Sequence, residues 1–495
     1  MKHKPIIFIN KIYLPKKSLF MAQIRILLAS INELTGRKNK PSQEIERKRL
    51  LAATLIIQGL YRCFCSGSHV ISLGVPHRPN AYKSDDENLI STVGFKIVMS
   101  VVDAMHELGW INRKMGYRTS DDGGEVTEIR AAGELLGVFQ NLGVVWEQMK
   151  PLEDAVVLRN YDSATKKKYK QTPPDSNGVR KMRPKLNKLN RFLNQQVICL
   201  DINNNSYEQL AGEMSNGAKA NKYQYSRESQ YPKYLDFTMV QLRRIFSRNS
   251  MKLGGRFYGG WWQFIPKKYR VSISINWLPT IEIDYSGLHP YMLYHLEGLE
   301  PPEGDMYNLG LWSTDAERDL KRPIVKEFFN AIVNDEYSRY VLPKEHKKVL
   351  GISSSKLINL IKKKHAPIAH RFESGYGLRL QYEDSQIAEQ VLMDLLNQGI
   401  VCLPIHDSFI VQSIERTTLE KAMKKAYKMR FGSAVDMKAT FQFDVDSRGK
   451  RKYEVQNPLP FGADEKVDRP AMFAMYADSI HAKYVQSHRL ATGLP

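Results

Sequence analysis

Two aspartates in the second half of the chain stand in settings that suit metal-dependent chemistry. Asp284 follows the alternating apolar residues Ile281 and Ile283, and Asp407 lies at a polar tip between two apolar runs. Carboxylates on neighbouring strands can hold two Mg²⁺ ions about 3.5–4 Å apart, which stabilises the attacking and leaving oxygens of phosphoryl or nucleotidyl transfer. Taken alone, either aspartate is more often a turn or cap residue. The assignment therefore depends on what lies between them.

The segment between the aspartates contains a run, residues 322–334, that predicts one amphipathic helix. Apolar side chains fill one side, and cationic and amide side chains recur every four residues on the other. These polar residues are Arg322, Lys326, Asn330 and Asn334. Such a stripe can bind a triphosphate through charge-assisted hydrogen bonds, although a surface helix with a solvated face has the same pattern. Pro323 disfavours helical geometry at Arg322, so the helix is expected to begin there.

The elements that must position the aspartates are expected to form one antiparallel sheet. Residues 271–283 alternate around a turn at 276–279 and end at Asp284, and residues 400–411 predict a hairpin with Asp407 at its bend. Alternation of Phe441, Phe443 and Val445 predicts a further strand of the same sheet. Two acids on that strand, Asp444 and Asp446, either approach the metals or lie at an exposed strand end. Residues 381–395 predict a core-packing helix.

The order of these segments resembles motifs A, B and C of the family A DNA polymerases and of the phage-type single-subunit RNA polymerases. Asp284-Tyr285-Ser286 is similar to motif A, the helix that carries Arg322 and Lys326 to motif B, and His406-Asp407 to motif C. Asp305-Met306-Tyr307 is similar to the segment that follows motif A in the DNA enzymes. The resemblance covers about residues 241–446, less than half of the chain.

This resemblance implies an α+β fold with a right-hand polymerase-like palm and helical fingers, and it implies roles for the motif residues. Asp284 and Asp407 would hold two Mg²⁺ ions, which Mn²⁺ could replace, with the carbonyl of Tyr285 as an extra ligand. Lys326 would join the two acids in catalysis. The implied nucleotide-binding residues are Arg322, Lys326, Asn330, Asn334 and His289. The implied nucleic-acid contacts are Arg256, Tyr258 and His406, with residues 254–260 supplying glycines for close backbone approach. Trp261 and Trp262 would stack nearby or pack in the core.

Several positions depart from the family pattern. Asn334 stands where the family has an aromatic residue that helps to read the sugar, and His289 stands where the DNA enzymes have a glutamate. Lys252 replaces an aspartate upstream of Gly255-Arg256. These departures leave the choice of sugar open. Asp201-Ile202-Asn203 lacks the second acid of an exonuclease pattern, so no proofreading is expected.

Upstream of residue 241 the patterns predict supporting elements. A helix over residues 91–108, a hairpin over 110–130 and a helix over 133–142 outline a winged-helix-like module, which either contacts DNA or only packs against its neighbours. Residues 161–188 are polar and basic and are interpreted as a linker or mobile basic loop, at whose end Met182, Leu186, Leu189 and Leu193 fall on one helical face. The expected divisions are a helical region (1–90), the winged-helix-like module (91–145), a basic linker and helical region (146–240), the palm and fingers (241–450) and a tail (451–495).

Composition limits the class of protein. The 495 residues include 73 Lys and Arg against 52 Asp and Glu, a formal charge of +21, and 42% hydrophobic residues. This content is sufficient for packed cores and excludes wholesale disorder. No apolar run is long enough to span a bilayer, and no signal sequence is recognisable, so a soluble cytoplasmic protein without membrane contact is expected. The four cysteines, Cys63, Cys65, Cys199 and Cys402, fit neither a zinc site nor a disulfide framework. The positive charge favours a nucleic-acid partner.

Three functions remain open at this level. The first is a template-dependent nucleotidyltransferase without proofreading, a DNA polymerase or alternatively a single-subunit RNA polymerase or primase, which uses nucleoside triphosphates with a template and a primer or product strand. The second is a non-enzymatic DNA-binding replication or regulatory protein. The third is a metal-dependent nuclease that uses the same acids, which leaves Arg322 and Lys326 without a purpose. The oligomeric state is not indicated.

Overall fold

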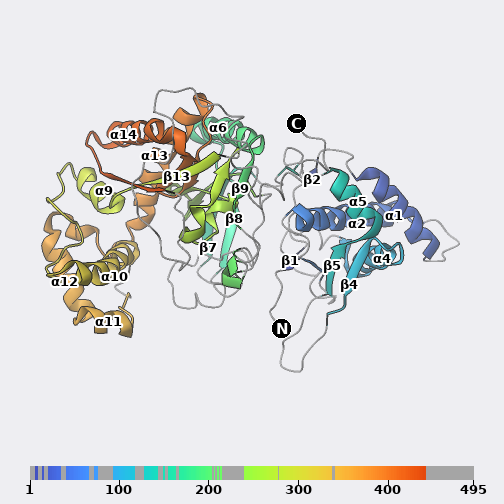
Figure 1. Ribbon diagram of the computed structural model, residues 1–495, viewed down its shortest axis with the longest axis horizontal. Coiled ribbons are helices and arrows are strands. Elements are labelled where there is room, and N and C mark those ends of the chain that lie inside the picture. The colour runs from blue at the N-terminus through green and yellow to red at the C-terminus, as the bar shows by residue number, and fades with distance from the viewer. Residues whose placement is uncertain are drawn as a thin grey trace.

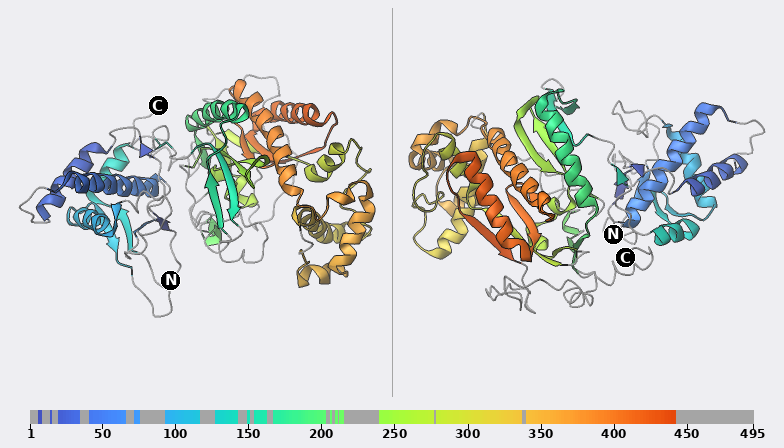
Figure 2. Two further views of the ribbon diagram at one scale, coloured as in Figure 1. Left: turned by 180° about the vertical axis from the view of Figure 1, so that it is seen from behind. Right: turned by 90° about the horizontal axis from the view of Figure 1, so that it is seen from above.

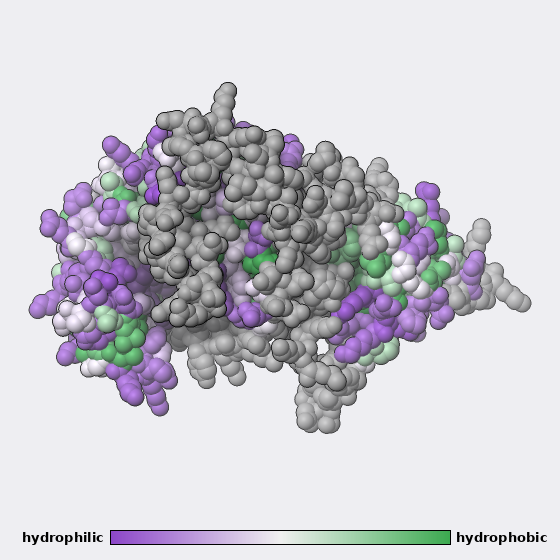
Figure 3. All heavy atoms as spheres, viewed as in Figure 1, coloured by the Kyte–Doolittle hydropathy of each residue, from purple (hydrophilic) through white to green (hydrophobic). Residues whose placement is uncertain are grey.

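The computed structural model describes residues 6–8, 14–15, 20–34, 41–65, 72–75, 93–116, 127–142, 149–150, 154–162, 167–202, 206, 209–210, 212–214, 239–276, 278–336 and 340–441. They form a mixed α+β fold with two hydrophobic cores, one within residues 20–139 and one within residues 156–435 (Figures 1 and 2). Among the helices so described, none is long and apolar enough to cross a membrane. Hydrophilic residues cover most of the described surface on the face drawn in Figure 3.

The N-terminal core packs helices against a small sheet. Its helices are α1 (Met21–Leu34), α2 (Gln43–Cys65), α4 (Phe95–Glu107) and α5 (Gly133–Leu142), and its strands are β1 (Ile6–Phe8), β3 (Ser72–Val75), β4 (Ile111–Lys114) and β5 (Thr127–Ala131), in the order β1-β3-β5-β4. The antiparallel pairing of β4 with β5 and the helices on either side confirm the predicted helix, hairpin and helix. The tip of that hairpin, residues 117–126, lies outside the described residues.

A second sheet begins the larger core. It contains β7 (Val156–Asp162), β8 (Lys167–Gln171), β10 (Arg243–Ser247) and β11 (Ser250–Tyr258), in the order β11-β10-β7-β8, while β2 (Leu14–Pro15) and β6 (Met149–Lys150) pair separately. The interpretation of residues 161–188 as a linker is wrong for the described part. Residues 158–162 of β7 pair with residues 167–171 of β8, and Ser176 caps helix α6 (Asn177–Asn194), as the apolar spacing at the end of the segment predicts. The charged residues simply lie on the exposed faces of these elements.

The third sheet carries both aspartates. It contains β9 (Ile198–Leu200), β12 (Ile273–Ile275), β13 (Leu278–Tyr285), β14 (Leu403–Ile405), β15 (Ser408–Gln412) and β16 (Met437–Phe441), all paired antiparallel. Strand β13 is central, with β15 on one side and β16 on the other. Both predicted hairpins are confirmed. Strand β16 ends at Phe441, the first residue of the strand expected over 441–445, and the rest of that expected strand, with Asp444 and Asp446, lies outside the described residues.

Helices cover one side of the third sheet. The hydroxyl of Tyr285 donates to the carbonyl of Met423 at 2.7 Å, so Tyr285 points toward helix α14 (Arg416–Phe431). Because side chains alternate along a strand, Asp284 points to the opposite face. Helix α13 (Gly377–Asn397) lies between α6 and α14 in the same layer, as the view from above in Figure 2 shows.

The remaining helices stand at the far end of the larger core (Figure 1). They are α9 (Leu288–Leu296), α10 (Asp315–Asn334), α11 (Lys344–Leu350) and α12 (Ser354–Lys364), with the short helix η4 (Ala366–Arg371) beside α9 and α12. Three other short helices, α8 (Lys267–Arg270), η3 (Trp261–Gln263) and η5 (Ser413–Glu415), contact the third sheet. The expectation that a helix begins at Arg322 is wrong. Thr314 caps α10 by accepting from the Glu317 amide at 3.2 Å, and the Glu317 carboxylate accepts from the Ser313 amide at 2.9 Å, so the helix starts before Pro323.

Candidate functional site

The sheet brings the two aspartates together. In the pairing of β13 with β15, the register partner of Asp284 is Ser408, the residue that follows Asp407 at the hairpin bend. His406, also in this bend, has a φ of +57°, which gives the tight turn that ends β14. Directly opposite residues of an antiparallel pair lie about 4.5–5.5 Å apart. The carboxylates of residues 284 and 407 therefore share one end of the sheet.

Asp284 is held in an unfavourable electrostatic environment. Burial raises its pKa, the Asp407 carboxylate adds to this, and the cations of Lys326 and Lys267 offset only part of the effect, so that the pKa lies at about 7. Its Oδ1 atom is buried and accepts no hydrogen bond from the described residues. A buried carboxylate oxygen beside a second carboxylate is stabilised by a bound cation.

Two lysines face Asp284 from different elements. Lys326 projects from α10, as the sequence predicts, and Lys267 comes from α8. Both are exposed. Lys267 was not among the predicted site residues, because a lysine after Ile265-Pro266 carries no motif. The signal that could have indicated it is its position 17 residues before Asp284, just upstream of the hairpin that carries the acid.

Glu282 fastens the strand that carries Asp284 to its neighbours. It shares the strand face of Asp284, two residues away. Its carboxylate accepts from Arg270 at 2.9 and 3.0 Å and from the hydroxyl of Ser408 at 2.8 Å. Glu282 thereby ties α8, the strand with Asp284 and the bend with Asp407 into one unit. The alternation of polar residues Thr280, Glu282 and Asp284 is the sequence signal for this polar face.

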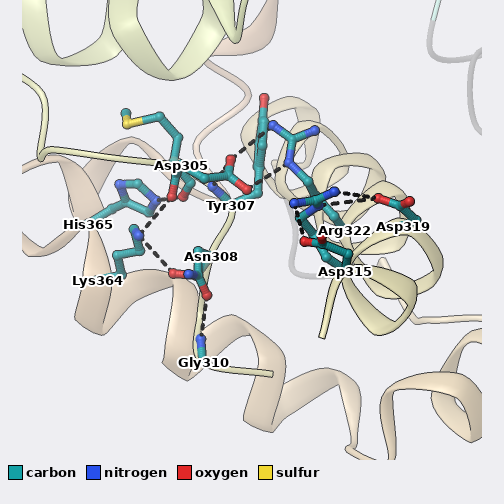
Figure 4. Close-up of polar contacts among 11 residues, drawn as sticks. Asp305, Tyr307, Asn308, Gly310, Asp315, Asp319, Arg322, Lys364 and His365 are labelled. Atoms are coloured by element: carbon teal, nitrogen blue, oxygen red, sulfur yellow. Dashed lines mark hydrogen bonds and ion pairs between the residues drawn. The ribbon is translucent and has the colours of Figure 1, made fainter. Parts of the chain in front are cut away.

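Arg322 is held near the site by Asp305 and Tyr307 (Figure 4). Its guanidinium donates to both oxygens of Asp305, at 2.7 and 2.9 Å, and lies over the ring of Tyr307 at 5.1 Å. Tyr307 is buried. Burial raises the pKa of its hydroxyl above the ordinary value, and the carboxylates of Asp407 and Asp284 add to that rise. Tyr307 therefore contacts Arg322 and lies within electrostatic range of both acids.

The loop that carries Asp305 and Tyr307 is anchored to the end of α12. The ammonium of Lys364 donates to the carbonyls of Asp305 and Asn308, at 3.0 and 2.7 Å, and His365 contacts the carbonyl of Met306 at 2.9 Å (Figure 4). Burial lowers the pKa of His365 to about 4, so the ring is neutral near pH 7. These contacts fix the orientation of the loop and, through Asp305, that of Arg322.

Arg256 is placed differently from the expectation of a phosphate contact. Its guanidinium forms a two-pronged ion pair with Asp384 of α13, and a terminal nitrogen lies 3.1 Å from Nε2 of His289. Asp384 is 2% exposed. Burial opposes ionisation of both groups, yet their attraction lowers the pKa of Asp384 and raises that of Arg256. Arg256 is thus a structural partner of α13 as well as a neighbour of the acids.

Asp384 was missed by the sequence analysis, although a signal was present. It occupies, with Glu383, a position on the buried face of α13 between Leu380 and Ile387, where an acid must find a cation. His289 joins it, because the His289 and Asp384 side chains lie 3.7 Å apart. The structure therefore links the predicted residues Arg256 and His289 through an acid that was expected only to pack.

The glycine-rich segment is filled by protein side chains. A Cβ on Gly255 would meet Phe246 at 2.6 Å, and one on Gly260 would meet Trp262 at 2.2 Å. Trp261 and Trp262 are fully buried, and Trp262 donates to the carbonyl of Pro404, so they have the core role. At Gly255 and Gly260 the space that a side chain would need is thus filled by the protein itself, and close approach of a nucleic-acid strand to this segment stays a prediction. Tyr258 packs edge-on against His406, with ring centroids 5.5 Å apart.

The last two residues of the predicted polar stripe of α10, Asn330 and Asn334, have different surroundings. Asn334 donates to the carbonyl of Asn330 at 2.7 Å, and its amide fills the space beside Gly377, where a Cβ would clash at 1.8 Å. Asn330 has a buried Oδ1 without a hydrogen-bond partner among the described residues. Asn330 thus keeps a buried acceptor that the described residues do not use, while Asn334 connects α10 to α13. The carbonyl of Tyr285 as a metal ligand stays a prediction.

The protein supplies only part of the ligand set that a Mg²⁺ ion needs. Among the described residues, no group of three or more His, Cys, Asp or Glu side chains is arranged to hold a metal. Mg²⁺, however, is commonly bound by one or two carboxylates together with waters and substrate phosphates. Asp284 and Asp407 match that donor set, and the bare buried oxygen of Asp284 supplies the observation in its favour.

No protein-family model matches the chain, and no curated protein matches it.

Proposed function

We propose that this protein is a template-dependent nucleotidyltransferase that joins nucleotides with Mg²⁺ at Asp284 and Asp407. The observation that supports it best is the placement of Asp284 opposite Ser408, which puts two carboxylates on one sheet end facing the cationic stripe of α10. A nuclease needs the acids but has no use for a triphosphate-binding helix. A binding protein needs neither.

In this proposal each side chain has a physical role. Asp284 and Asp407 hold Mg²⁺, which compensates negative charge on the reacting phosphate oxygens when it is bound. Lys326 and Lys267 provide positive charge beside Asp284. The planar guanidinium of Arg322 binds phosphate oxygens, and Asp305 and the ring of Tyr307 fix its orientation. His289, held by Arg256 and Asp384, stands next to the nucleotide.

The finer architecture belongs to the same proposal. The third sheet would be a palm, α10 to α12 would be fingers, and the N-terminal core would contain a winged-helix-like module. On α4 the exposed residues are Lys96, Asp103, His106 and Glu107, and Arg113 pairs with Asp103. This balanced charge does not favour insertion of α4 into a DNA groove, so the module is proposed to pack rather than to read DNA.

Primer extension tests the proposed function. A labelled primer on a DNA template with Mg²⁺ should be extended with dNTPs or rNTPs, and Asp407→Asn should abolish extension while the fold survives. The preferred nucleotide would identify the product. Glu327→Gln, a change of the same type on the exposed side of α10, is the matched control and should retain activity. Extension retained in both Asp284→Asn and Asp407→Asn would refute the proposal.

A further inference from the structure

A second cationic surface lies on the side of the molecule opposite the candidate active site. Helix α6 contains six Lys and Arg residues and no acid, and helix α14 contains six Lys and Arg residues and one acid, Glu420. Their apolar faces are buried in the larger core. Eleven of these twelve cations are exposed; Arg183 is half-buried and pairs with Asp154, and Arg430 bonds the buried Glu383 of α13.

Helix α13 lies between the two basic helices and contacts both. Two half-buried acids of α13 form ion pairs, one with each of the neighbouring helices. Glu389 pairs with Lys185 of α6 at 2.6 Å, and Asp394 pairs with Lys425 of α14 at 3.0 Å. Lys188 of α6 also donates to Asn397 of α13 at 3.0 Å. The outward acids of α13 are thus neutralised, and the three helices form one layer (Figure 2).

Several lysines on this layer remain without compensation. Lys421, Lys424 and Lys428 recur at intervals of three and four residues, which places them in one line along α14. They are exposed, and Lys181 of α6 is exposed too. None of these four lysines forms an ion pair or hydrogen bond with a described residue. We define the basic layer as the outward cations of α6 and α14 with α13 between them.

The basic layer does not face the acids. Tyr285 of β13 points to α14, whereas Asp284, one residue earlier, points to the other side of the sheet. Lys326 and Lys267, which face Asp284, come from α10 and α8 and not from this layer. Charge needed for a nucleotide at the active site therefore does not explain the basic layer.

The dimensions of the basic layer fit a nucleic-acid duplex. Helices of 16 to 18 residues are about 25 Å long, and a duplex of that length carries roughly fifteen phosphates. Packed helices lie about 8–10 Å apart, so α6 and α14, on either side of α13, are separated by more than the roughly 12 Å width of a B-DNA major groove. Cations on the two helices can therefore meet phosphates on both borders of one groove.

A lipid surface fits less well. Membrane-binding helices expose an apolar face to the bilayer, but the apolar faces of α6 and α14 are used in the core, and the one large apolar side chain exposed on α14 is Met429. We propose that the basic layer binds the phosphate backbone of a DNA duplex outside the active site. The choice of nucleic acid over another polyanion rests on the proposed function.

The test measures the salt dependence of duplex binding. The full-length protein is titrated into a labelled duplex of about 30 base pairs at several salt concentrations without Mg²⁺, and log K is plotted against log[salt]. The triple variant Lys421→Gln/Lys424→Gln/Lys428→Gln should lower the magnitude of the slope by about 2 to 3, since each lost phosphate contact removes about 0.9. Lys181→Gln/Lys188→Gln should lower it by about 2.

The matched control has the same charge change elsewhere. Lys344→Gln/Lys347→Gln/Lys348→Gln on α11 should leave the slope unchanged, and circular dichroism should show that every variant is folded. Equal slopes for the α14 variant and wild type, or an equal loss in the control, would overturn the proposal. So would loss of binding to phosphatidylserine vesicles with an unchanged DNA slope. Primer extension is measured separately, because absent extension with an altered slope would refute only the proposed function.

Discussion

Arg256 on β11 and Asp384 on α13 form a buried, two-pronged ion pair beside the candidate active site, with Nε of Arg256 2.8 Å from Oδ2 of Asp384. The two residues are 128 positions apart in the sequence. Their side chains are 13% and 1% exposed. This pair joins the second sheet to the helix layer and holds His289 at the edge of the site.

Removing one partner of this pair should destabilise the protein strongly. In Asp384→Asn the buried guanidinium of Arg256 loses its compensating charge, and such changes cost about 3–5 kcal/mol of unfolding free energy. Denaturant unfolding measures it. Lys268→Ala, which breaks the exposed pair with Glu213, is the control and should cost less than about 1 kcal/mol. Similar losses in the two variants would contradict the structural role of Asp384.

The raised pKa of Asp284 predicts a pH-dependent effect of its removal. The folded-state pKa is about 7, against 3.8 for the unfolded chain, so ionisation in the folded state is unfavourable and stability is lost as the pH rises through this interval. Asp284→Asn removes that loss. Its melting temperature should equal that of wild type near pH 4 and exceed it at pH 8, measured in EDTA. A difference independent of pH would show that Asp284 ionises freely.

Removal of Lys267 should change the pKa of Asp284. Its charge lowers the pKa of Asp284, so Lys267→Gln should raise that pKa and move the acidic limb of the pH profile of primer extension to higher pH. The neighbouring Lys268→Gln is the matched control, because Lys268 bonds Glu213 at 2.5 Å instead. A limb that stays in place in Lys267→Gln, or that moves equally in both variants, would exclude this role.

Arg322 should contribute through its geometry and not only through its charge. Arg322→Lys keeps the charge but loses the two-pronged contact with Asp305 and the stacking on Tyr307. We expect roughly a tenfold rise in KM for the nucleotide, equivalent to about 1.4 kcal/mol. Arg318→Lys on the same helix, where Arg318 pairs with Asp315 and Asp319, should have little effect. An unchanged KM in Arg322→Lys would place the triphosphate elsewhere.

The sequence predicted the local elements of the site well where periodicity is strong. The strand before Asp284, the hairpin around Asp407 and the amphipathic face of α10 are all observed, since alternation and helical spacing record which side of an element is buried. The start of α10 was misplaced. Pro323 suggested a boundary, but the capping contact of Thr314 with Glu317 had already begun the helix.

The partners of charged residues could not be predicted in the same way. The type of a cationic residue does not show whether it is exposed or buried. Arg256 was therefore expected to bind phosphate, although it forms an ion pair with Asp384. Likewise residues 161–188 were interpreted as a linker, because charge on the exposed face of a hairpin and a helix resembles charge in a loop. The pairing of β7 with β10 and the packing of α6 against α13 show that the segment contains regular elements.

By itself, the sequence determined a basic α+β chain with two acids at strand ends and a cationic helix between them, because these features depend on residue type and short spacing alone. The tertiary structure decided that Asp284 and Asp407 meet at one sheet end, that Lys267 and Lys326 face the former, and that α6 and α14 display their cations on the opposite side. Such relations join residues tens to hundreds of positions apart. Strand register and helix packing set them, and both arise only when the hydrophobic core closes.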